Sequence, residues 1–133
     1  MSNRSEGNAF ERIFCEKLSR AGFWAHNMAQ RAEGQPADVL AVRNDIAYLI
    51  DCKVCEKDFF RIDRMEENQE SSMSLWRSCG NRGAYFAVRL SDGSTYMVPF
   101  RHVMEAKRKG VKSLKRKDLI MYVSIDEWLR SRL

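Results

Sequence analysis

Two short apolar segments separated by a polar turn constrain the fold more strongly than any other part of this sequence. Residues 37–42 and 46–54 are rich in apolar and β-branched side chains, and the residues between them are polar. This pattern predicts two buried strands joined by a tight turn. With Asn44 and Asp45 as the two turn residues, the strands form a hairpin in which the numbers of every opposed pair sum to 89.

The predicted register brings three charged side chains to one end of this hairpin. Asp38 lies opposite Asp51, with the Cβ atoms roughly 4.5–5.5 Å apart. Lys53 projects from the same face as Asp51, because it is two residues further along the strand. Two buried carboxylates that face each other repel, and a divalent cation is the simplest group that makes their approach favourable. The hairpin therefore predicts a metal site made by Asp38 and Asp51, with Lys53 beside it.

The composition is that of one globular domain. The chain has 133 residues, of which 44% are hydrophobic, which is enough for one core and too little for two. We expect a single domain over residues 1–133, with a core of about 6–100 and a basic segment and C-terminal helix over 101–133. The net charge of +5 favours an anionic partner only weakly. Because no apolar run is long enough to cross a membrane and the first ten residues are polar, we expect a cytoplasmic protein without a membrane partner.

Hydrophobic periodicity and turn residues predict the remaining elements. We expect helices over residues 5–21, 58–79, near 100–109 and at the C-terminus, and strands over 84–90, 95–100 and near 119–123. Residues 25–36 have no period and end in turn formers, which predicts a loop. Ser124 and Glu127 have the spacing of a capping box for the last helix. The predicted fold class is α/β: a single domain with a mixed central β-sheet flanked by helices.

Two polar residues on the predicted helices are candidates for the same site. Gln69 lies on the apolar stripe of its helix between Ile62 and Trp76, so the helix directs a primary amide inward. A role in the site and a buried amide satisfied by the backbone remain equally open for it. Glu11 lies at the margin of the apolar stripe of the first helix, where a solvated glutamate is the simpler interpretation.

The cysteines leave a second kind of site open. Cys52 and Cys55 have the C-x-x-C spacing of zinc and redox sites, whereas Cys15 and Cys79 are single and have no His at ligand spacing. Because Cys52 lies inside a predicted strand, we interpret it as a reduced core cysteine. A zinc or redox protein built on Cys52 and Cys55 is the alternative.

Positive charge is concentrated in the segment that follows the third predicted helix. Its basic residues are Lys107, Arg108, Lys109, Lys112, Lys115, Arg116 and Lys117. A solvated loop is the simpler interpretation, and a surface that contacts DNA phosphates becomes the better one if the acidic site acts on a phosphodiester. Arg31 and Gln35, in the predicted loop, are further candidates for contacts with the DNA backbone.

Metal-assisted hydrolysis of a phosphodiester is the reaction that uses Asp38, Asp51 and Lys53 together. The carboxylates would hold one or two Mg²⁺ ions, which activate a water and contact phosphate oxygens. Lys53 would orient that water or stabilise negative charge that develops on the phosphate. We expect Mn²⁺ to substitute for Mg²⁺.

On these residues the sequence resembles the PD-(D/E)xK nuclease superfamily and, within it, the small Holliday-junction resolvases. The segments that carry the resemblance are Gly7–Glu11, Gly34–Val42, Ile50–Val54, Phe59–Gln69 and Gly83–Val88. The pair that contains the lysine begins with Asp51 rather than the more usual Glu, and the proline precedes Asp38 by two positions.

The resemblance implies a fold, a set of site residues and partners. It implies a restriction-endonuclease-like core with the order α-β-β-α-β. Glu11, Asp38 and Asp51 would be metal ligands, Lys53 the catalytic lysine, and Gln69 a polar group next to the site. It also implies a homodimer that binds branched DNA, needs no small-molecule cofactor, and is encoded by a bacterium or a virus.

The resulting prediction is a Mg²⁺-dependent DNA endonuclease that resolves four-way junctions in recombination and repair. A nicking, repair or restriction-type nuclease of the same superfamily is the first alternative. A nuclease-fold protein that binds DNA without cutting it is the second.

Overall fold

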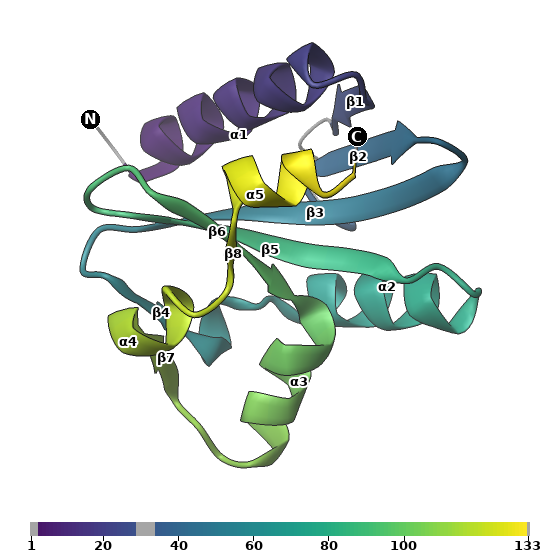
Figure 1. Ribbon diagram of the computed structural model, residues 1–133. Coiled ribbons are helices and arrows are strands. Elements are labelled where there is room, and N and C mark those ends of the chain that lie inside the picture. Colours follow the sequence, from purple (N-terminus) through teal and green to yellow (C-terminus); the bar gives the residue numbers. More distant parts are fainter. Residues whose placement is uncertain (1–2, 29–33, 133) are drawn as a thin grey trace.

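A six-stranded mixed sheet with helices on both faces forms the body of the molecule (Figure 1). The computed structural model describes residues 3–28 and 34–132. The strand order is β1-β2-β3-β5-β6-β8, with β3 and β5 parallel and the other neighbours antiparallel. The strands are β1 (Trp24–Asn27), β2 (Val39–Arg43), β3 (Ile46–Cys55), β5 (Gly83–Leu90), β6 (Thr95–Pro99) and β8 (Val123–Ser124). The predicted fold class is confirmed.

Helices cover the sheet from opposite sides. On one face lie α1 (Asn3–Arg20) and α5 (Ile125–Arg130), and on the other lie α2 (Glu67–Ser78) and α3 (Phe100–Arg108) (Figure 1). A smaller two-stranded sheet of β4 (Phe59–Arg61) and β7 (Ser113–Lys115) lies beside α4 (Arg116–Leu119), and the 3₁₀ helix η1 (Ile62–Arg64) follows β4. No helix of the described ranges has the length and apolar character needed to cross a membrane.

Each face of the sheet has its own apolar core. On the α1 and α5 side, Trp128 is buried and stacks on Phe23 with ring centroids 5.7 Å apart. On the α2 and α3 side, Phe60 meets Phe86 edge to face at 5.5 Å, and Met73 is fully buried. Because both faces of the central strand β3 are covered, charged side chains on this strand lie in a largely dry environment.

The hairpin of β2 and β3 has the predicted register. Val39 pairs with Ile50 and Arg43 pairs with Ile46. Asn44 and Asp45 both have positive φ, 52° and 63°. Two consecutive left-handed residues make a type I′ turn, whose twist matches that of the strands it joins. The turn therefore fixes which side chain of β3 meets the end of β2.

Several predicted elements differ from the structure. The predicted loop over 25–36 contains most of strand β1, and residues 29–33 lie outside the described ranges. The predicted helix over 58–79 begins only at Glu67, because the preceding residues form β4, in which Phe60 pairs with Leu114. The predicted short strand near 119–123 is displaced: β8 begins only at Val123, and α4 and a turn occupy the residues before it. At the last helix the Ser124 hydroxyl accepts a hydrogen bond from the Glu127 N–H at 3.3 Å, which is one half of the expected capping box.

Candidate active site

The end of the β2–β3 hairpin places Asp38 against strand β3. The Asp38 N–H donates to the carbonyl oxygen of Ile50 at 3.2 Å, so strand-like pairing already includes the residue before β2. The Asp38 carboxylate in turn accepts a hydrogen bond at 2.8 Å from the backbone N–H of Cys52. Asp38 is buried, with 7% of its surface exposed. The predicted approach of Asp38 to the Asp51–Lys53 segment is thus present.

Asp51, Lys53 and Gln69 form a connected polar network. The Gln69 Nε2 donates to Asp51 Oδ1 at 3.1 Å, and the Lys53 Nζ donates to Gln69 Oε1 at 3.2 Å. The Lys53 Nζ also lies 3.1 Å from Asp51 Oδ2. All three side chains are buried, and Asp51 is only 1% exposed. Gln69 therefore contacts both members of the Asp-x-Lys pair, which favours a role in the site over satisfaction by the backbone alone.

The N-terminus of α2 explains the position of Gln69. Glu66 is the N-cap of α2, and its backbone N–H donates to Gln69 Oε1 at 3.1 Å as part of a capping box. This bond fixes the amide at the third position of the helix and directs it toward β3. The same oxygen receives the Lys53 ammonium. A feature that begins the helix thus also positions the lysine.

Glu11 reaches the same site from α1. It is 7% exposed and lines a cavity of about 390 Å³ together with Asp38, Asp51, Lys53 and Gln69. Burial raises the pKa of Glu11 to about 8, and hydrogen bonding to Asp38 and repulsion by it add to the shift. The interpretation of Glu11 as a solvated surface glutamate is therefore wrong.

The carboxyl group of Asp51 is also hard to ionise in this arrangement. Burial raises its pKa to about 8; the positive charge of Lys53 opposes this shift, and the Asp38 carboxylate adds to it. Carboxyl groups that crowd together in a dry cavity favour either a retained proton or a bound cation.

Two buried oxygen atoms indicate that the cavity suits a cation. Glu11 Oε1 and Asp51 Oδ2 have no hydrogen-bond donor, although Lys53 lies close enough to Asp51 Oδ2 to form an ion pair. Buried polar atoms without partners are rare and expensive, and carboxylate oxygens are the ligands that Mg²⁺ takes. In the conformation described, no three His, Cys, Asp or Glu side chains of residues 3–28 and 34–132 are arranged closely enough to hold a metal ion. In this conformation Lys53 and Gln69 engage the two oxygens of Asp51.

Comparison with known proteins decides the family. The family model described as archaeal Holliday junction resolvase (Hjc) matches residues 2–128. The chain belongs to this family. It lies within the PD-(D/E)xK nuclease superfamily, as its motifs indicate. The match gives no support to the expected bacterial or viral source.

A solved structure of a family member has the same fold. The structure of Archaeoglobus fulgidus Hjc, described as a Holliday junction resolvase from an archaeal hyperthermophile, is similar with a TM-score of 0.67. The two sequences are 21% identical, and the similarity covers 94% of this chain and 96% of that chain. The comparison with curated proteins found no significant match.

The residues predicted to contact DNA differ in their surroundings in this Hjc-family chain. Gln35 lies inside the cavity, where its side chain donates to Asp38 Oδ1 at 3.3 Å, and Arg31 lies outside the described residues. In the basic segment, three side chains form ion pairs: Lys107 with Glu70, Lys109 with Glu105, and Arg116 with Asp58 and Asp92. The remaining four, Arg108, Lys112, Lys115 and Lys117, are exposed. Contact between this segment and DNA stays a prediction.

Two residues of the cavity escaped the sequence analysis. Asn68 donates to the Gln35 carbonyl oxygen at 2.9 Å, and Arg64 donates to the Val54 carbonyl oxygen at 2.8 Å. Arg64 ends η1 and Asn68 lies in the first turn of α2, and the single helix predicted over 58–79 concealed both positions. The Glu66–Gln69 spacing was the signal that could have located the start of α2.

Cys52 is half-buried and Cys55 is buried. Both are free, and burial raises the pKa of each above its usual range. A raised pKa disfavours the thiolate, which is the form that binds zinc and attacks disulfides. The Cys55 sulfur instead accepts a hydrogen bond from Arg64. These contacts favour the interpretation of both residues as packed core cysteines.

Proposed function

We propose that this protein is a divalent-cation-dependent endonuclease that cuts four-way DNA junctions. The observation that carries the proposal is the buried network of Asp51, Lys53 and Gln69, with Asp38 beside it at the end of the hairpin. The network lies in a chain that belongs to a family of junction resolvases. The geometry supplies what phosphodiester hydrolysis needs: acidic oxygens for a cation and a fixed ammonium for developing negative charge.

Three carboxylates are suited to hold the cation. Asp38, Asp51 and Glu11 line one cavity; Glu11 presents an oxygen without a donor, and only the Lys53 ammonium approaches Asp51 Oδ2. A bound Mg²⁺ or Mn²⁺ would supply Lewis-acid activation of the phosphodiester. Gln35 donates to the oxygen of Asp38 that Cys52 does not bind, so it orients this carboxylate.

Lys53 and Gln69 act together on the substrate side of the site. The Lys53 ammonium is buried, and a buried charge without a hydrogen-bond partner is costly. Gln69 Oε1 accepts one of its protons whichever way the Asp51 carboxylate turns, so the lysine keeps a partner when Asp51 binds a cation. The remaining ammonium protons can then donate to a phosphate oxygen, where they stabilise charge that develops during cleavage.

We further propose that the active form is a homodimer. Resolution of a four-way junction requires cuts in two strands, and each chain has one such network. Two copies related by a two-fold axis would place two networks on the two strands. Light scattering during gel filtration measures this directly, and a monomer that stays monomeric on junction DNA would contradict it.

A cleavage assay with defined metals tests the proposed activity. A labelled four-way junction and its linear duplex arms are incubated with Mg²⁺, Mn²⁺, Ca²⁺ or a chelator. We expect cuts in the junction with Mg²⁺ and Mn²⁺, and none with the chelator. Equal cutting of linear duplex would contradict junction selectivity, and equal cutting with the chelator would contradict the role of the cation.

A further inference from the structure

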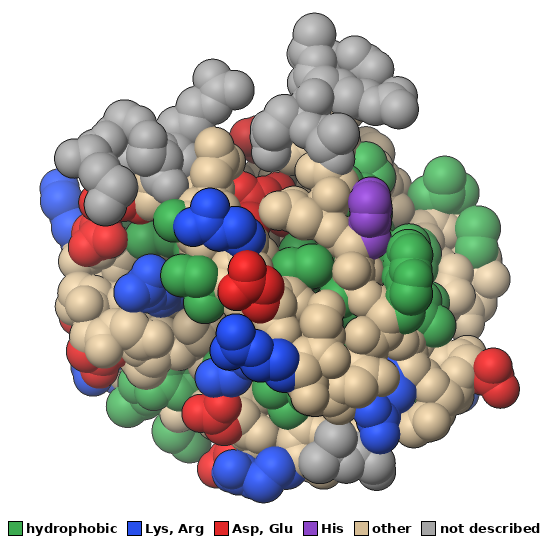
Figure 2. Space-filling view, turned by 90° about the horizontal axis from the view of Figure 1, so that it is seen from above, with side chains coloured by type: hydrophobic (Ala, Val, Ile, Leu, Met, Phe, Trp, Pro, Cys, Tyr) green, Lys and Arg blue, Asp and Glu red, His purple; other side chains and the backbone are tan. Residues whose placement is uncertain are grey.

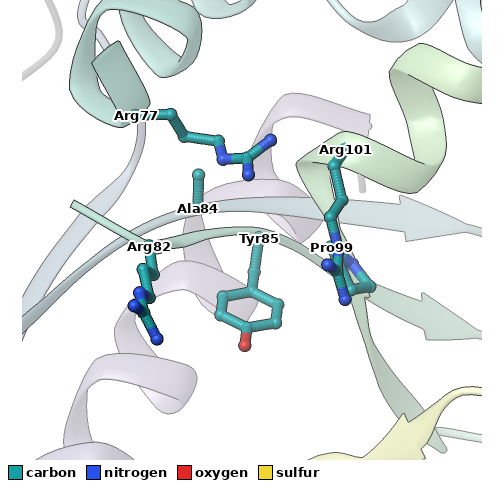
Figure 3. A pocket seen from close by; sticks show the side chains of 6 residues that line it. All are labelled: Arg77, Arg82, Ala84, Tyr85, Pro99 and Arg101. Atoms are coloured by element: carbon teal, nitrogen blue, oxygen red, sulfur yellow. The ribbon is translucent and has the colours of Figure 1, made fainter. Parts of the chain in front are cut away.

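A second concave surface, lined by arginines, lies away from the carboxylate cavity. Its volume is about 400 Å³, and it is lined by Arg77, Arg82, Ala84, Tyr85, Pro99 and Arg101. No acidic residue of the described ranges lines it. In Figure 3 the ring of Tyr85 lies between Arg82 and Arg101, and Arg77 extends from the end of α2 on the other side of the strand, beside Ala84. We call this surface the arginine pocket.

The three arginines of the pocket come from three different parts of the fold. Arg77 lies in the last turn of α2, Arg82 lies just before β5, and Arg101 lies in the first turn of α3. All three arginines are exposed, so their guanidinium groups are available to a ligand. Three cationic side chains around one pocket with no carboxylate in its lining repel one another, and an anion relieves this repulsion. Guanidinium groups bind phosphate oxygens in a forked geometry.

Two neutral features of the pocket also favour an anion. The Tyr85 hydroxyl accepts a hydrogen bond at 3.1 Å from the Nη2 of Arg132, so its own proton remains to be donated. α3 begins at Phe100, directly between Pro99 and Arg101 of the lining. The first backbone N–H groups of a helix have no partner within the helix and attract negative charge.

The surface over α1 and α5 differs in charge pattern from the arginine pocket. The face that carries α1 and α5 mixes Lys and Arg with Asp and Glu (Figure 2). On it, for example, Lys17 pairs with Asp126 at 2.8 Å. The arginine pocket is therefore distinct from the ordinary balanced surface.

Helix α2 links the arginine pocket to the carboxylate cavity. Gln69 lies in its first turn and Arg77 lies eight residues later, in its last turn. This separation is about 12 Å along the helix axis at 1.5 Å per residue. A DNA strand that runs parallel to α2 would span this separation in three or four nucleotides, since its phosphates follow one another every 3.4 Å along the duplex axis.

We propose that the arginine pocket binds one phosphodiester group of the DNA substrate, a few nucleotides from the bond that the carboxylate cavity cleaves. This inference rests on the proposed function, since it takes DNA as the ligand. The pocket holds one arm of the DNA junction by its phosphate backbone, and this contact does not read the base sequence.

Paired charge-removing variants test the pocket. The pocket variant is Arg82→Gln/Arg101→Gln, and the matched control is Arg20→Gln/Arg130→Gln, which removes two exposed arginines from the ends of α1 and α5. The Kd for a four-way junction is measured in a chelator from 50 to 200 mM salt. Thermal unfolding of each variant checks that the fold is intact.

The pocket variant is expected to lose one phosphate contact. Its plot of log Kd against log salt becomes shallower by about 0.9, so the weakening of binding across this fourfold salt range is about 3.5-fold smaller than in wild type. Its Kd at 50 mM salt rises by about tenfold, the equivalent of one charge-assisted hydrogen bond. The control variant changes the slope of log Kd against log salt by less than half as much as the pocket variant does.

The possible results separate the pocket from the proposed function. If wild type binds the junction and the pocket variant keeps its slope and Kd, or changes no more than the control, the pocket proposal is overturned and the nuclease proposal stands. If wild type binds no DNA, the proposed function fails instead. A neutral methylphosphonate placed three or four nucleotides from the cut should weaken binding by wild type and leave the pocket variant unaffected. Equal weakening of both proteins by that substitution would also overturn the pocket.

Discussion

Replacing Gln69 by leucine is the sharpest test of the network at the end of the hairpin. Gln69 donates to Asp51 at 3.1 Å and accepts from Lys53 at 3.2 Å and from the backbone N–H of Glu66 at 3.1 Å. Leucine has a similar size but can make none of these bonds. Gln69→Leu thus leaves a buried carboxylate and a buried ammonium with one partner fewer each.

The expected loss of stability follows from these contacts. A buried polar group that loses its partner costs about 1–3 kcal/mol, and there are two such groups. The broken capping interaction costs about 1 kcal/mol more. Burial of the leucine side chain returns about 2 kcal/mol. The free energy of unfolding should therefore fall by about 1–5 kcal/mol, which lowers Tm by roughly 4–20 °C in a domain of this size.

Urea unfolding and junction cleavage measure the two consequences. Ser71→Leu is the matched control, because Ser71 is exposed on the same helix, and its change should stay within about 0.5 kcal/mol. Gln69→Leu should also cut a junction about 10- to 100-fold more slowly, as expected for loss of a group that orients a metal site, while it still binds the junction. If Gln69→Leu is as stable and as active as Ser71→Leu, the network does not have the role assigned to it.

Three further predictions concern charge and packing. Asp51→Asn should fold, bind DNA and fail to cut it, because burial raises the pKa of this carboxyl and so makes its ionised form costly to the fold; circular dichroism showing an unfolded variant would contradict this. Without metal, stability should fall between about pH 5 and pH 9, because Glu11 and Asp51, with pKa values raised to about 8, bind more protons in the native state than in the unfolded state. Mg²⁺ should raise Tm at pH 9 and not at pH 5. A Tm that rises with pH in a chelator would contradict the predicted fall in stability. Phe60→Ala should cost about 3–5 kcal/mol in urea unfolding, since Phe60 is fully buried in β4; a change below 1 kcal/mol would contradict its place in the core.

The parts of the site that were predictable depend on local chemistry. The polar turn with Asn44 and Asp45 selects a two-residue loop, and that loop length alone sets Asp38 beside Asp51. Gln69 was predicted to point inward because helical periodicity holds on α2, even though the start of the helix was misplaced. Short-range turn and helix rules therefore gave most of the site.

The parts that were missed depend on partners distant in the sequence. β4 is a strand because Phe60 pairs with Leu114, and nothing near Phe59 indicates that partner. β1 is an edge strand in which three of four residues are exposed, so it lacks the alternation that marks a half-buried strand. The charge of Arg116 is offset by Asp58 and Asp92, which only the fold brings to it.

The most direct test of the central claim is the position and number of cuts in a four-way junction. A labelled junction with Mg²⁺ is treated with wild type and with Asp51→Asn, and the products are mapped on all four strands. The account predicts paired, symmetric nicks near the branch with wild type and none with Asp51→Asn. Cutting by Asp51→Asn at the wild-type rate, or no cutting by wild type despite tight binding, would contradict the assignment of this network as the active site.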